Sequence, residues 1–189
     1  GIWRSYVPPL AKDRVITILG LGTLGTACGI ALKRLGFNVR GWSRREKRVD
    51  GILCFYGDDQ IDSSLLDADI VVLLLPDTPL TQNILNKHTL NLLKRGAFVL
   101  NPGRGPLIDD DALLAALDSG QIEHATLDVF RIEPLPQNHQ YWSNNKVTVI
   151  PHKASETRPK TASQVIAMNI GRAENGQELL YLVDRENGY

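Results

Sequence analysis

The sequence predicts an α/β protein built on a parallel, doubly wound sheet. Short runs of β-branched and aliphatic residues alternate with helix-forming segments along most of the 189 residues, and this alternation is typical of parallel sheets. The apolar run Val15 to Leu19 has the composition of a buried strand, and a helix-forming segment follows it. The turn between them, residues 20–25, reads G-L-G-T-L-G. Together these observations predict a domain of the Rossmann type.

The N-terminal half of the chain contains the first βαβ unit and the start of the next. After the strand at residues 15–19, the pattern predicts a helix over residues 23–35, ended by Gly36, and a strand over residues 38–42. Further elements are expected in this order: a short strand at 53–56, a short helix at 60–66, and a buried strand at 70–75 that stops at Pro76.

The C-terminal half continues the alternation. The expected elements are a helix at 88–93, a strand at 97–101, a helix at 112–117, strands at 124–129 and 147–150, and a long helix at 158–173. Three carboxylates, Asp109 to Asp111, precede the helix at 112–117, where the helix dipole favours negative charge. We interpret them as a helix start rather than as metal or substrate ligands.

Composition excludes several classes of partner. The chain has 21 Lys and Arg against 21 Asp and Glu, so it has no general attraction to nucleic acid or anionic membranes. The longest apolar run, Ile70 to Leu75, is too short to cross a bilayer. Cys28 and Cys54 lie among apolar residues without a C-x-x-C pattern, which predicts buried, reduced thiols, no metal site and a cytoplasmic location.

The expected organisation is a single folded domain over residues 13–176. Residues 1–12, which contain Pro8-Pro9, are interpreted as a linker or as the cut end of a longer chain. Residues 177–189 are expected to form a C-terminal tail.

The G-x-G-x-x-G turn predicts dinucleotide binding. Gly20 would permit the tight turn, Gly22 would let the backbone approach a pyrophosphate, and Gly25 would let the helix pack on the strand. Backbone N–H groups at the start of the helix, at Thr23 and Leu24, would then face the phosphates. The alternative is an ordinary strand–helix turn, since the pattern alone is weak.

The end of the second strand predicts which dinucleotide binds. An NAD site usually places a carboxylate there, whereas this chain has Trp42, Ser43, Arg44 and Arg45. A hydroxyl and guanidinium groups suit a 2′-phosphate, so NADP is preferred over NAD in this interpretation. The alternative is a solvated basic loop, because Lys47 and Arg48 extend the run.

Three ionisable residues follow later strands of the predicted sheet. Arg104 lies in N-P-G-R-G after the strand at 97–101, Glu133 follows the strand at 124–129, and His152 follows the strand at 147–150. Each alone is more often a surface or packing group than a catalyst. Because ligands of open α/β sheets bind at the carboxyl ends of the strands, the three together predict an active site.

The ordered motifs resemble those of the D-isomer-specific 2-hydroxyacid dehydrogenase family, and within it are most similar to the bacterial-type glyoxylate/hydroxypyruvate reductases. The resemblance covers almost the whole chain. It rests on G-L-G-T-L-G at 20–25, W-S-R at 42–44, L-L-P-D-T-P-L-T at 74–81, N-P-G-R-G at 101–105, A-L-D-S-G at 116–120, L-D-V-F-R-I-E-P-L-P at 127–136, P-H at 151–152 and V-D-R-E-N-G-Y at 183–189.

The resemblance implies roles for the candidate residues. His152 would protonate the carbonyl oxygen of a small 2-oxo acid as hydride arrives from the nicotinamide, and Glu133 would orient His152 and stabilise its imidazolium form. Arg104 would bind the substrate carboxylate, and Asp128 would hold the nicotinamide carboxamide. Further cofactor contacts are implied for Leu75, Pro76, Thr78, Thr81, Pro102 and Gly103.

The resemblance also sets expectations for the whole protein. The substrate-domain segment of the family is largely missing from this chain, so we expect cofactor binding with poor turnover, and the family implies a homodimer. Lys153 stands where family members usually carry an apolar residue. Two alternatives stay open: a nucleotide-sensing module like the family's corepressor relatives, and a related dehydrogenase with a bulkier 2-oxo acid.

Overall fold

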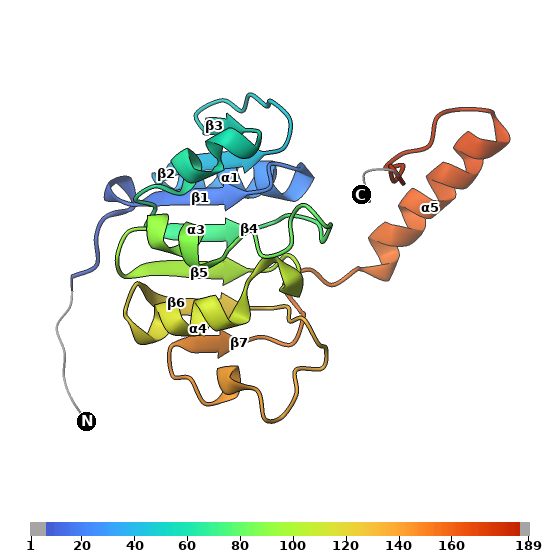
Figure 1. Ribbon diagram of the computed structural model, residues 1–189. Coiled ribbons are helices and arrows are strands. Elements are labelled where there is room, and N and C mark those ends of the chain that lie inside the picture. Colours follow the sequence, from blue (N-terminus) through green and yellow to red (C-terminus); the bar gives the residue numbers. More distant parts are fainter. Residues whose placement is uncertain (1–6, 186–189) are drawn as a thin grey trace. The chain divides into compact units, whose positions relative to one another are not determined.

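A seven-stranded parallel sheet organises the protein, which is described here from a computed structural model over residues 7–185 (Figure 1). The strand order is β3-β2-β1-β4-β5-β6-β7, and every neighbouring pair is parallel. The strands are β1 (Val15–Leu19), β2 (Asn38–Ser43), β3 (Leu53–Tyr56), β4 (Ile70–Leu73), β5 (Ala97–Asn101), β6 (Ile122–Leu127) and β7 (Val147–Val149). The predicted fold class is confirmed.

Five α-helices connect or follow the strands in the described part of the chain. They are α1 (Thr23–Arg34), α2 (Ile61–Leu65), α3 (Lys87–Leu92), α4 (Asp110–Asp118) and α5 (Pro159–Glu174). Four short 3-10 helices accompany them, at Ala11–Asp13, Asp58–Gln60, Gly105–Leu107 and Gln140–Trp142. The expected helix at residues 60–66 is divided between the 3-10 helix Asp58–Gln60 and α2.

The two faces of the sheet bury separate apolar clusters. On β1, Ile16 and Ile18 point to one cluster and Leu19 to the other, because successive side chains of a strand alternate between faces. The smaller cluster packs against Leu32 of α1. The larger cluster contains side chains from α2, α3 and α4, including Leu65, Leu90 and Leu113 among its buried members. The sheet is therefore covered on both sides, as a doubly wound fold requires.

The chain divides into two compact units, Gly1–His152 and Lys153–Tyr189. The division falls at residue 152, whereas the sequence pattern placed the end of the domain at residue 176. Helix α5, in the second unit, contains no buried residue. Parts of the expected linker and tail, residues 1–6 and 186–189, lie outside the described residues.

The prediction of two buried cysteines is wrong. Cys28 is exposed and Cys54 is only partly buried. Helix α1 turns Gly25 and Gly29 toward the protein interior, and residues four apart share one face of a helix. Ala27 and Cys28, which lie between these glycines, are both exposed, so an apolar sequence around Cys28 does not place it in the core.

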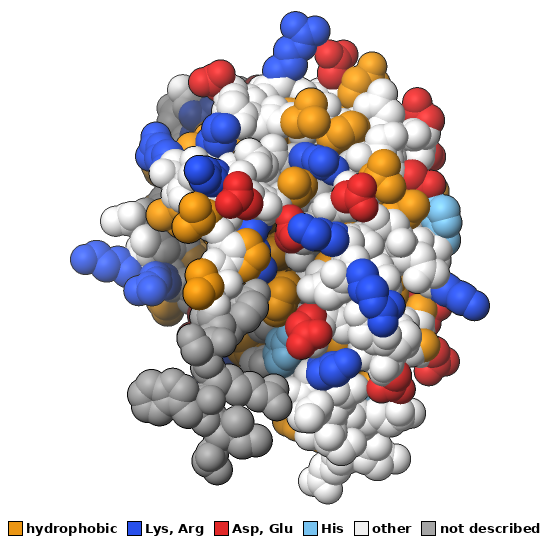
Figure 2. Space-filling model, turned by 90° about the vertical axis from the view of Figure 1, so that its left-hand side faces the viewer, with side chains coloured by type: hydrophobic (Ala, Val, Ile, Leu, Met, Phe, Trp, Pro, Cys, Tyr) orange, Lys and Arg blue, Asp and Glu red, His pale blue; other side chains and the backbone are white. Residues whose placement is uncertain are grey.

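Charged side chains of both signs are interspersed over the face shown in Figure 2. Among the helices within residues 7–185, none combines the length and hydrophobicity that a membrane crossing requires. The same residues contain no group of three or more His, Cys, Asp and Glu side chains able to hold a metal ion.

Candidate active site

All candidate residues of the sheet unit lie at or beyond the carboxyl ends of its strands. Since all seven strands are parallel, the segments that follow them leave the same edge of the sheet. The strand order reverses between β1 and β4, which are neighbours in space. This point of reversal is where open α/β sheets bind their ligands.

The three glycines of the turn after β1 have different surroundings. Gly20 has φ +110°, and a Cβ there would lie 2.4 Å from the carbonyl oxygen of Leu74. A Cβ on Gly25 would lie 1.8 Å from the carbonyl oxygen of Gly20, so the start of α1 approaches the turn closely. A Cβ on Gly22 would meet nothing within 4 Å. Backbone atoms therefore pack closely against the turn at Gly20 and Gly25, whereas the space beside Gly22 is open.

The start of α1 fits an anionic group. Gly22 is the N-cap of this 12-residue helix and no side chain caps its first turn. Thr23 and Leu24, the first two helical residues, are exposed. The backbone N–H groups of a helix N-terminus carry partial positive charge and bind phosphates. The residues present therefore fit the pyrophosphate of a dinucleotide.

The end of β2 supplies a small hydroxyl and basic residues. Ser43 is 7% exposed and its hydroxyl donates to the carbonyl oxygen of Arg45 at 2.8 Å. Trp42 is buried in the larger apolar cluster, and its Nε1 donates to the carbonyl oxygen of Gly57 at 2.8 Å. The Trp42 side chain therefore stabilises the core beneath the site. Arg44 is partly buried and Arg45 is exposed.

Lys47 belongs to the basic run that follows β2. Its ammonium group donates to the carbonyl oxygen of Leu21, inside the glycine-rich turn. The basic segment after β2 therefore folds back onto the turn after β1. The basic run in the sequence indicates positive charge near the turn, but it does not indicate which of its Lys and Arg residues contacts the turn.

The loop after β4 is held together by threonine hydroxyls. Thr81 is 9% exposed, and its hydroxyl donates to the carbonyl oxygen of Pro76 at 2.7 Å. It also accepts from the backbone N–H of Thr78 at 2.9 Å. The Thr81 hydroxyl thus stabilises the loop through hydrogen bonds to its own backbone. Leu75, Pro76 and Thr78 are partly buried at this edge.

A buried asparagine shapes the loop that carries Arg104. The Asn101 side chain accepts from the Gly103 N–H at 3.1 Å and donates to the carbonyl oxygen of Arg104 at 2.9 Å. A Cβ on Gly103 would lie 2.8 Å from the carbonyl oxygen of Leu73, so the loop lies against the end of β4. Asn101 was not among the predicted site residues, although an asparagine before Pro-Gly is typical of a side-chain-stabilised turn.

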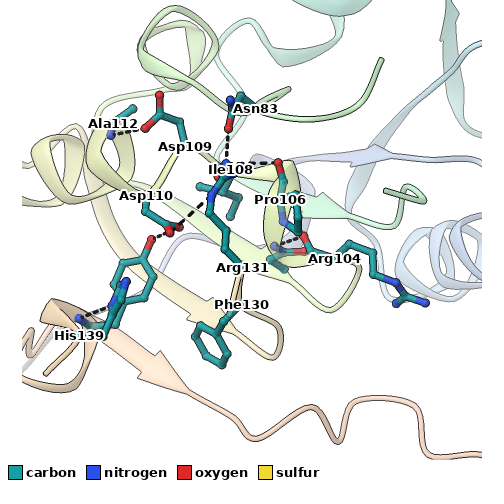
Figure 3. Close-up of polar contacts among 12 residues, drawn as sticks. Asn83, Arg104, Pro106, Ile108, Asp109, Asp110, Ala112, Phe130, Arg131 and His139 are labelled. Carbon is teal, nitrogen blue, oxygen red and sulfur yellow. Dashed lines mark hydrogen bonds and ion pairs between the residues drawn. The ribbon is translucent and has the colours of Figure 1, made fainter. Parts of the chain in front are cut away.

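Arg104 itself is exposed. One of its guanidinium nitrogens donates to the carbonyl oxygen of Gly103 at 2.7 Å. In Figure 3 the side chain extends away from the polar cluster drawn beside it. A guanidinium in this position retains N–H groups that can bind a carboxylate in two places.

Glu133 and His152, which are 19 positions apart in sequence, form a direct pair. The His152 Nδ1 lies 2.8 Å from Glu133 Oε2. The other oxygen, Oε1, accepts from the Phe130 N–H at 2.9 Å. Desolvation opposes ionisation of Glu133, but the hydrogen bonds from His152 and Phe130 and the positive charge of Arg104 outweigh it, so the pKa of Glu133 lies below its ordinary value. Glu133 is therefore a carboxylate near neutral pH.

The backbone around His152 is constrained. His152 has φ +49°, in the left-handed region, which side chains with a Cβ adopt mainly where the surroundings hold them. Its N–H donates to the carbonyl oxygens of Asp128 at 2.9 Å and Ile150 at 3.0 Å. Asp128, 4% exposed, donates its own N–H to the carbonyl oxygen of Asn101 at 3.0 Å. The ends of β5, β6 and β7 are thereby joined.

This arrangement sets the chemistry of the histidine. Because ionised Glu133 can only accept, the proton on Nδ1 of His152 must be the donor in their hydrogen bond. The opposite nitrogen, Nε2, then carries a lone pair in the neutral ring and a proton in the imidazolium. Such a pair is suited to general acid–base chemistry, with Arg104 close enough to influence the charge of Glu133.

The fold and the site define a nucleotide-binding domain of the Rossmann type. Sequence comparison agrees, because the model of the D-isomer specific 2-hydroxyacid dehydrogenase NAD-binding domain matches residues 1–154. The chain therefore belongs to the D-isomer specific 2-hydroxyacid dehydrogenase family.

Individual relatives refine the comparison. The chain is 43% identical over 187 residues to glyoxylate/hydroxypyruvate reductase A of Serratia proteamaculans (strain 568) and 40% identical over 187 residues to that of Photorhabdus laumondii. Each match covers 99% of this chain and 60% of the relative. The chain thus spans 60% of the length of these curated relatives.

Solved structures show the same domain. A D-isomer specific 2-hydroxyacid dehydrogenase from Xanthobacter autotrophicus Py2, in complex with NADPH and MES, superposes with a TM-score of 0.96 at 45% identity, over 99% of this chain and 77% of that one. An NADPH-dependent glyoxylate/hydroxypyruvate reductase from Sinorhizobium meliloti, in complex with NADP and sulfate, gives 0.95 at 34% identity, over 99% of this chain and 60% of that one.

Proposed function

We propose that this chain is the cofactor-binding part of an NADPH-dependent reductase that acts on small 2-oxo acids of the glyoxylate and hydroxypyruvate type. The observation that carries the proposal is the 2.8 Å contact between Glu133 and His152 at the carboxyl edge of the sheet. A nucleotide-binding domain without proton chemistry has no need for a histidine oriented by a carboxylate. The NADPH and NADP complexes of the two structural relatives support the choice of cofactor.

NADPH, when bound, would supply the hydride that reduces the carbonyl carbon of the substrate. His152 donates the Nε2 proton of its imidazolium form to the carbonyl oxygen, so that a hydroxyl group forms. Glu133 remains ionised, holds Nδ1–H throughout and stabilises the positive charge before the proton leaves. In the oxidation direction the neutral Nε2 accepts the same proton.

Two further side chains orient the reactants in this proposal. Arg104 binds the substrate carboxylate through its planar guanidinium and draws electron density from the adjacent carbonyl, a task that the single ammonium of lysine fulfils less well. Asp128, which directly follows β6, would accept a hydrogen bond from the nicotinamide carboxamide. Its backbone position is fixed by the hydrogen bonds to Asn101 and His152.

Arg44 is expected to select NADPH over NADH. A guanidinium beside the ribose pairs with the 2′-phosphate, and a charge-assisted hydrogen bond contributes about 1.5–3 kcal/mol. Arg44→Ala should therefore weaken NADPH binding about 10- to 100-fold and leave NADH binding nearly unchanged. Titration of nucleotide fluorescence with the chain measures both affinities. Arg95→Ala, a change at the opposite edge of the sheet before β5, is the matched control. Equal weakening for both nucleotides would contradict the assignment.

The substrate class is tested by oxidation of NADPH with a panel of 2-oxo acids. The panel is run on this chain and on a fusion that adds the unmatched 40% of the Serratia proteamaculans relative, of which this chain covers 60%. We expect slow turnover for the chain alone and reduction of glyoxylate and hydroxypyruvate by the fusion. Preference of the fusion for bulky aromatic or phosphorylated 2-oxo acids would overturn the proposed substrate class.

A further inference from the structure

Arg131 joins three segments of the sheet unit through one guanidinium group (Figure 3). One of its terminal nitrogens donates to the side chain of Asn83 and to the carbonyl oxygen of Ile108. The same nitrogen lies 3.4 Å from the carbonyl oxygen of Pro106. Its Nε lies 3.6 Å from the carboxylate of Asp110, at the start of α4. The side chain is 35% exposed, so these contacts are partly shielded from water.

Asp110 is also linked to Phe130, the residue before Arg131, through the side chain of Tyr141. The hydroxyl of Tyr141 donates to Asp110 Oδ1 at 2.9 Å, and Tyr141 is 2% exposed. Burial and the negative charge of Asp110 raise the pKa of Tyr141, so it remains a donor. The Tyr141 ring packs against Phe130, with centroids 6.4 Å apart. Arg131 is therefore linked to the Asp110 carboxylate directly, and Phe130 is linked to it through Tyr141.

The anchored residues adjoin the two loops of the candidate active site. The N–H of Phe130 holds Oε1 of Glu133, and Glu133 holds His152. On the other side, a Cβ on Gly105 would lie 2.0 Å from the Phe130 carbonyl carbon and 2.4 Å from the Arg131 nitrogen. The residue after Arg104 is thus in close backbone contact with the segment that carries Glu133.

We propose that Arg131 is a positioning residue that fixes the Glu133–His152 pair relative to Arg104. This inference rests on the proposed function, in which those three side chains act on one substrate. Arg131 binds the carbonyls of Pro106 and Ile108 in the segment after Arg104, and it belongs to the segment that leads to Glu133. A shift of either segment would change the distance between the carboxylate-binding guanidinium and the proton donor.

Arginine suits this task better than lysine. The guanidinium is planar and has five N–H donors in a rigid fork, so it can serve Asn83, Ile108 and Asp110 from one position. An ammonium group on a flexible stem cannot hold the same set of acceptors at once. Arg131→Lys therefore keeps the positive charge but removes the planar set of N–H donors.

The test measures the tautomer of His152, which depends on the hydrogen bond between Nδ1 and Glu133. In alkaline solution, where imidazole is neutral, nitrogen chemical shifts report which ring nitrogen carries the proton. The chain has four histidines, and His152→Asn identifies the signals of His152. We expect the Nδ1–H tautomer in the unmodified chain and a change of roughly tenfold in the tautomer ratio toward Nε2–H in Arg131→Ala, as for a loosened charge-assisted hydrogen bond. Arg131→Lys should give a smaller change in the same direction.

Arg95→Ala is the matched control, because Arg95 also donates to a backbone carbonyl, that of Ser119 at 2.7 Å, but lies before β5 at the other edge of the sheet. It should leave the His152 tautomer unchanged. If Arg131→Ala does not fold, Arg131→Lys decides the question. A tautomer ratio that is the same in the Arg131 variants as in the unmodified chain would overturn the proposal.

Steady-state kinetics of the fusion distinguish a failure of this inference from a failure of the proposed function. In the fusion, Arg131→Lys should lower kcat about tenfold with KM for NADPH unchanged, because the segments proposed to bind the phosphates follow β1 and β2, and Arg131 contacts neither. A rise in KM for NADPH with kcat unchanged would overturn the positioning role. If the unmodified fusion reduces no 2-oxo acid, the proposed function fails, whereas the tautomer measurement still decides whether Arg131 holds the Glu133–His152 pair.

Discussion

His152→Asn is expected to lower kcat for 2-oxo acid reduction in the fusion by about 10²- to 10⁴-fold, the usual contribution of a general acid. Asparagine can occupy the space and accept or donate a hydrogen bond, but it cannot release a proton to the carbonyl oxygen. Binding of NADPH should be unchanged, because His152 follows β7 whereas the glycine-rich turn follows β1. Steady-state oxidation of NADPH and fluorescence titration measure the two quantities on the same preparation.

His88→Asn serves as the control for this change. His88 also pairs with a carboxylate, Asp62, at 2.7 Å, but it is exposed on α3 and, among the hydrogen bonds and ion pairs of the described residues, contacts none of those assigned to the candidate active site. It should retain full activity. Full activity in His152→Asn would remove the proton-donor assignment and would favour a nucleotide-sensing module, for which loss of a proton donor has no consequence.

Gly25→Ala is expected to destabilise the folded domain strongly, by about 3 kcal/mol or more. The added Cβ would lie 1.8 Å from the carbonyl oxygen of Gly20, and backbone at both positions has little room to move. The gain in helix propensity from alanine, about 1 kcal/mol, is too small to compensate. Chemical denaturation of the chain measures the free energy of unfolding.

Gly22→Ala separates nucleotide binding from stability. A Cβ on Gly22 meets nothing within 4 Å, and its φ of −72° is accessible to alanine, so the free energy of unfolding should fall by only about 1 kcal/mol, the usual cost of alanine at an N-cap. The methyl group would instead occupy the surface that a pyrophosphate approaches, and NADPH affinity should fall about tenfold or more. If Gly22→Ala binds NADPH as tightly as the unmodified chain, the phosphates do not bind at this turn.

Much of the sheet could be predicted from local sequence patterns. The runs at residues 15–19, 53–56 and 97–101 coincide with β1, β3 and β5, because buried parallel strands are short, continuous and apolar. Boundaries were less accurate where the pattern extended past the hydrogen-bonded ladder. The apolar run at residues 70–75 continues beyond the end of β4 at Leu73, since apolar composition marks burial and not pairing.

The exposure of the cysteines required the structure. Cys28 has apolar neighbours in sequence but is exposed on α1. Whether a side chain is buried depends on which elements pack against it, and the residue types around it in sequence do not determine this.

The sequence by itself determined that this protein has a parallel sheet with a glycine-rich turn after its first strand, and that Arg104, Glu133 and His152 follow later strands. These features depend on periodicity and chain order, which are local properties. Only the tertiary structure decided that Glu133 holds His152 at 2.8 Å, that Asn101 shapes the Arg104 loop, and that Arg131 joins the segments around both. Those contacts bring together side chains from distant parts of the chain, and their distances are set by the packing of the whole sheet.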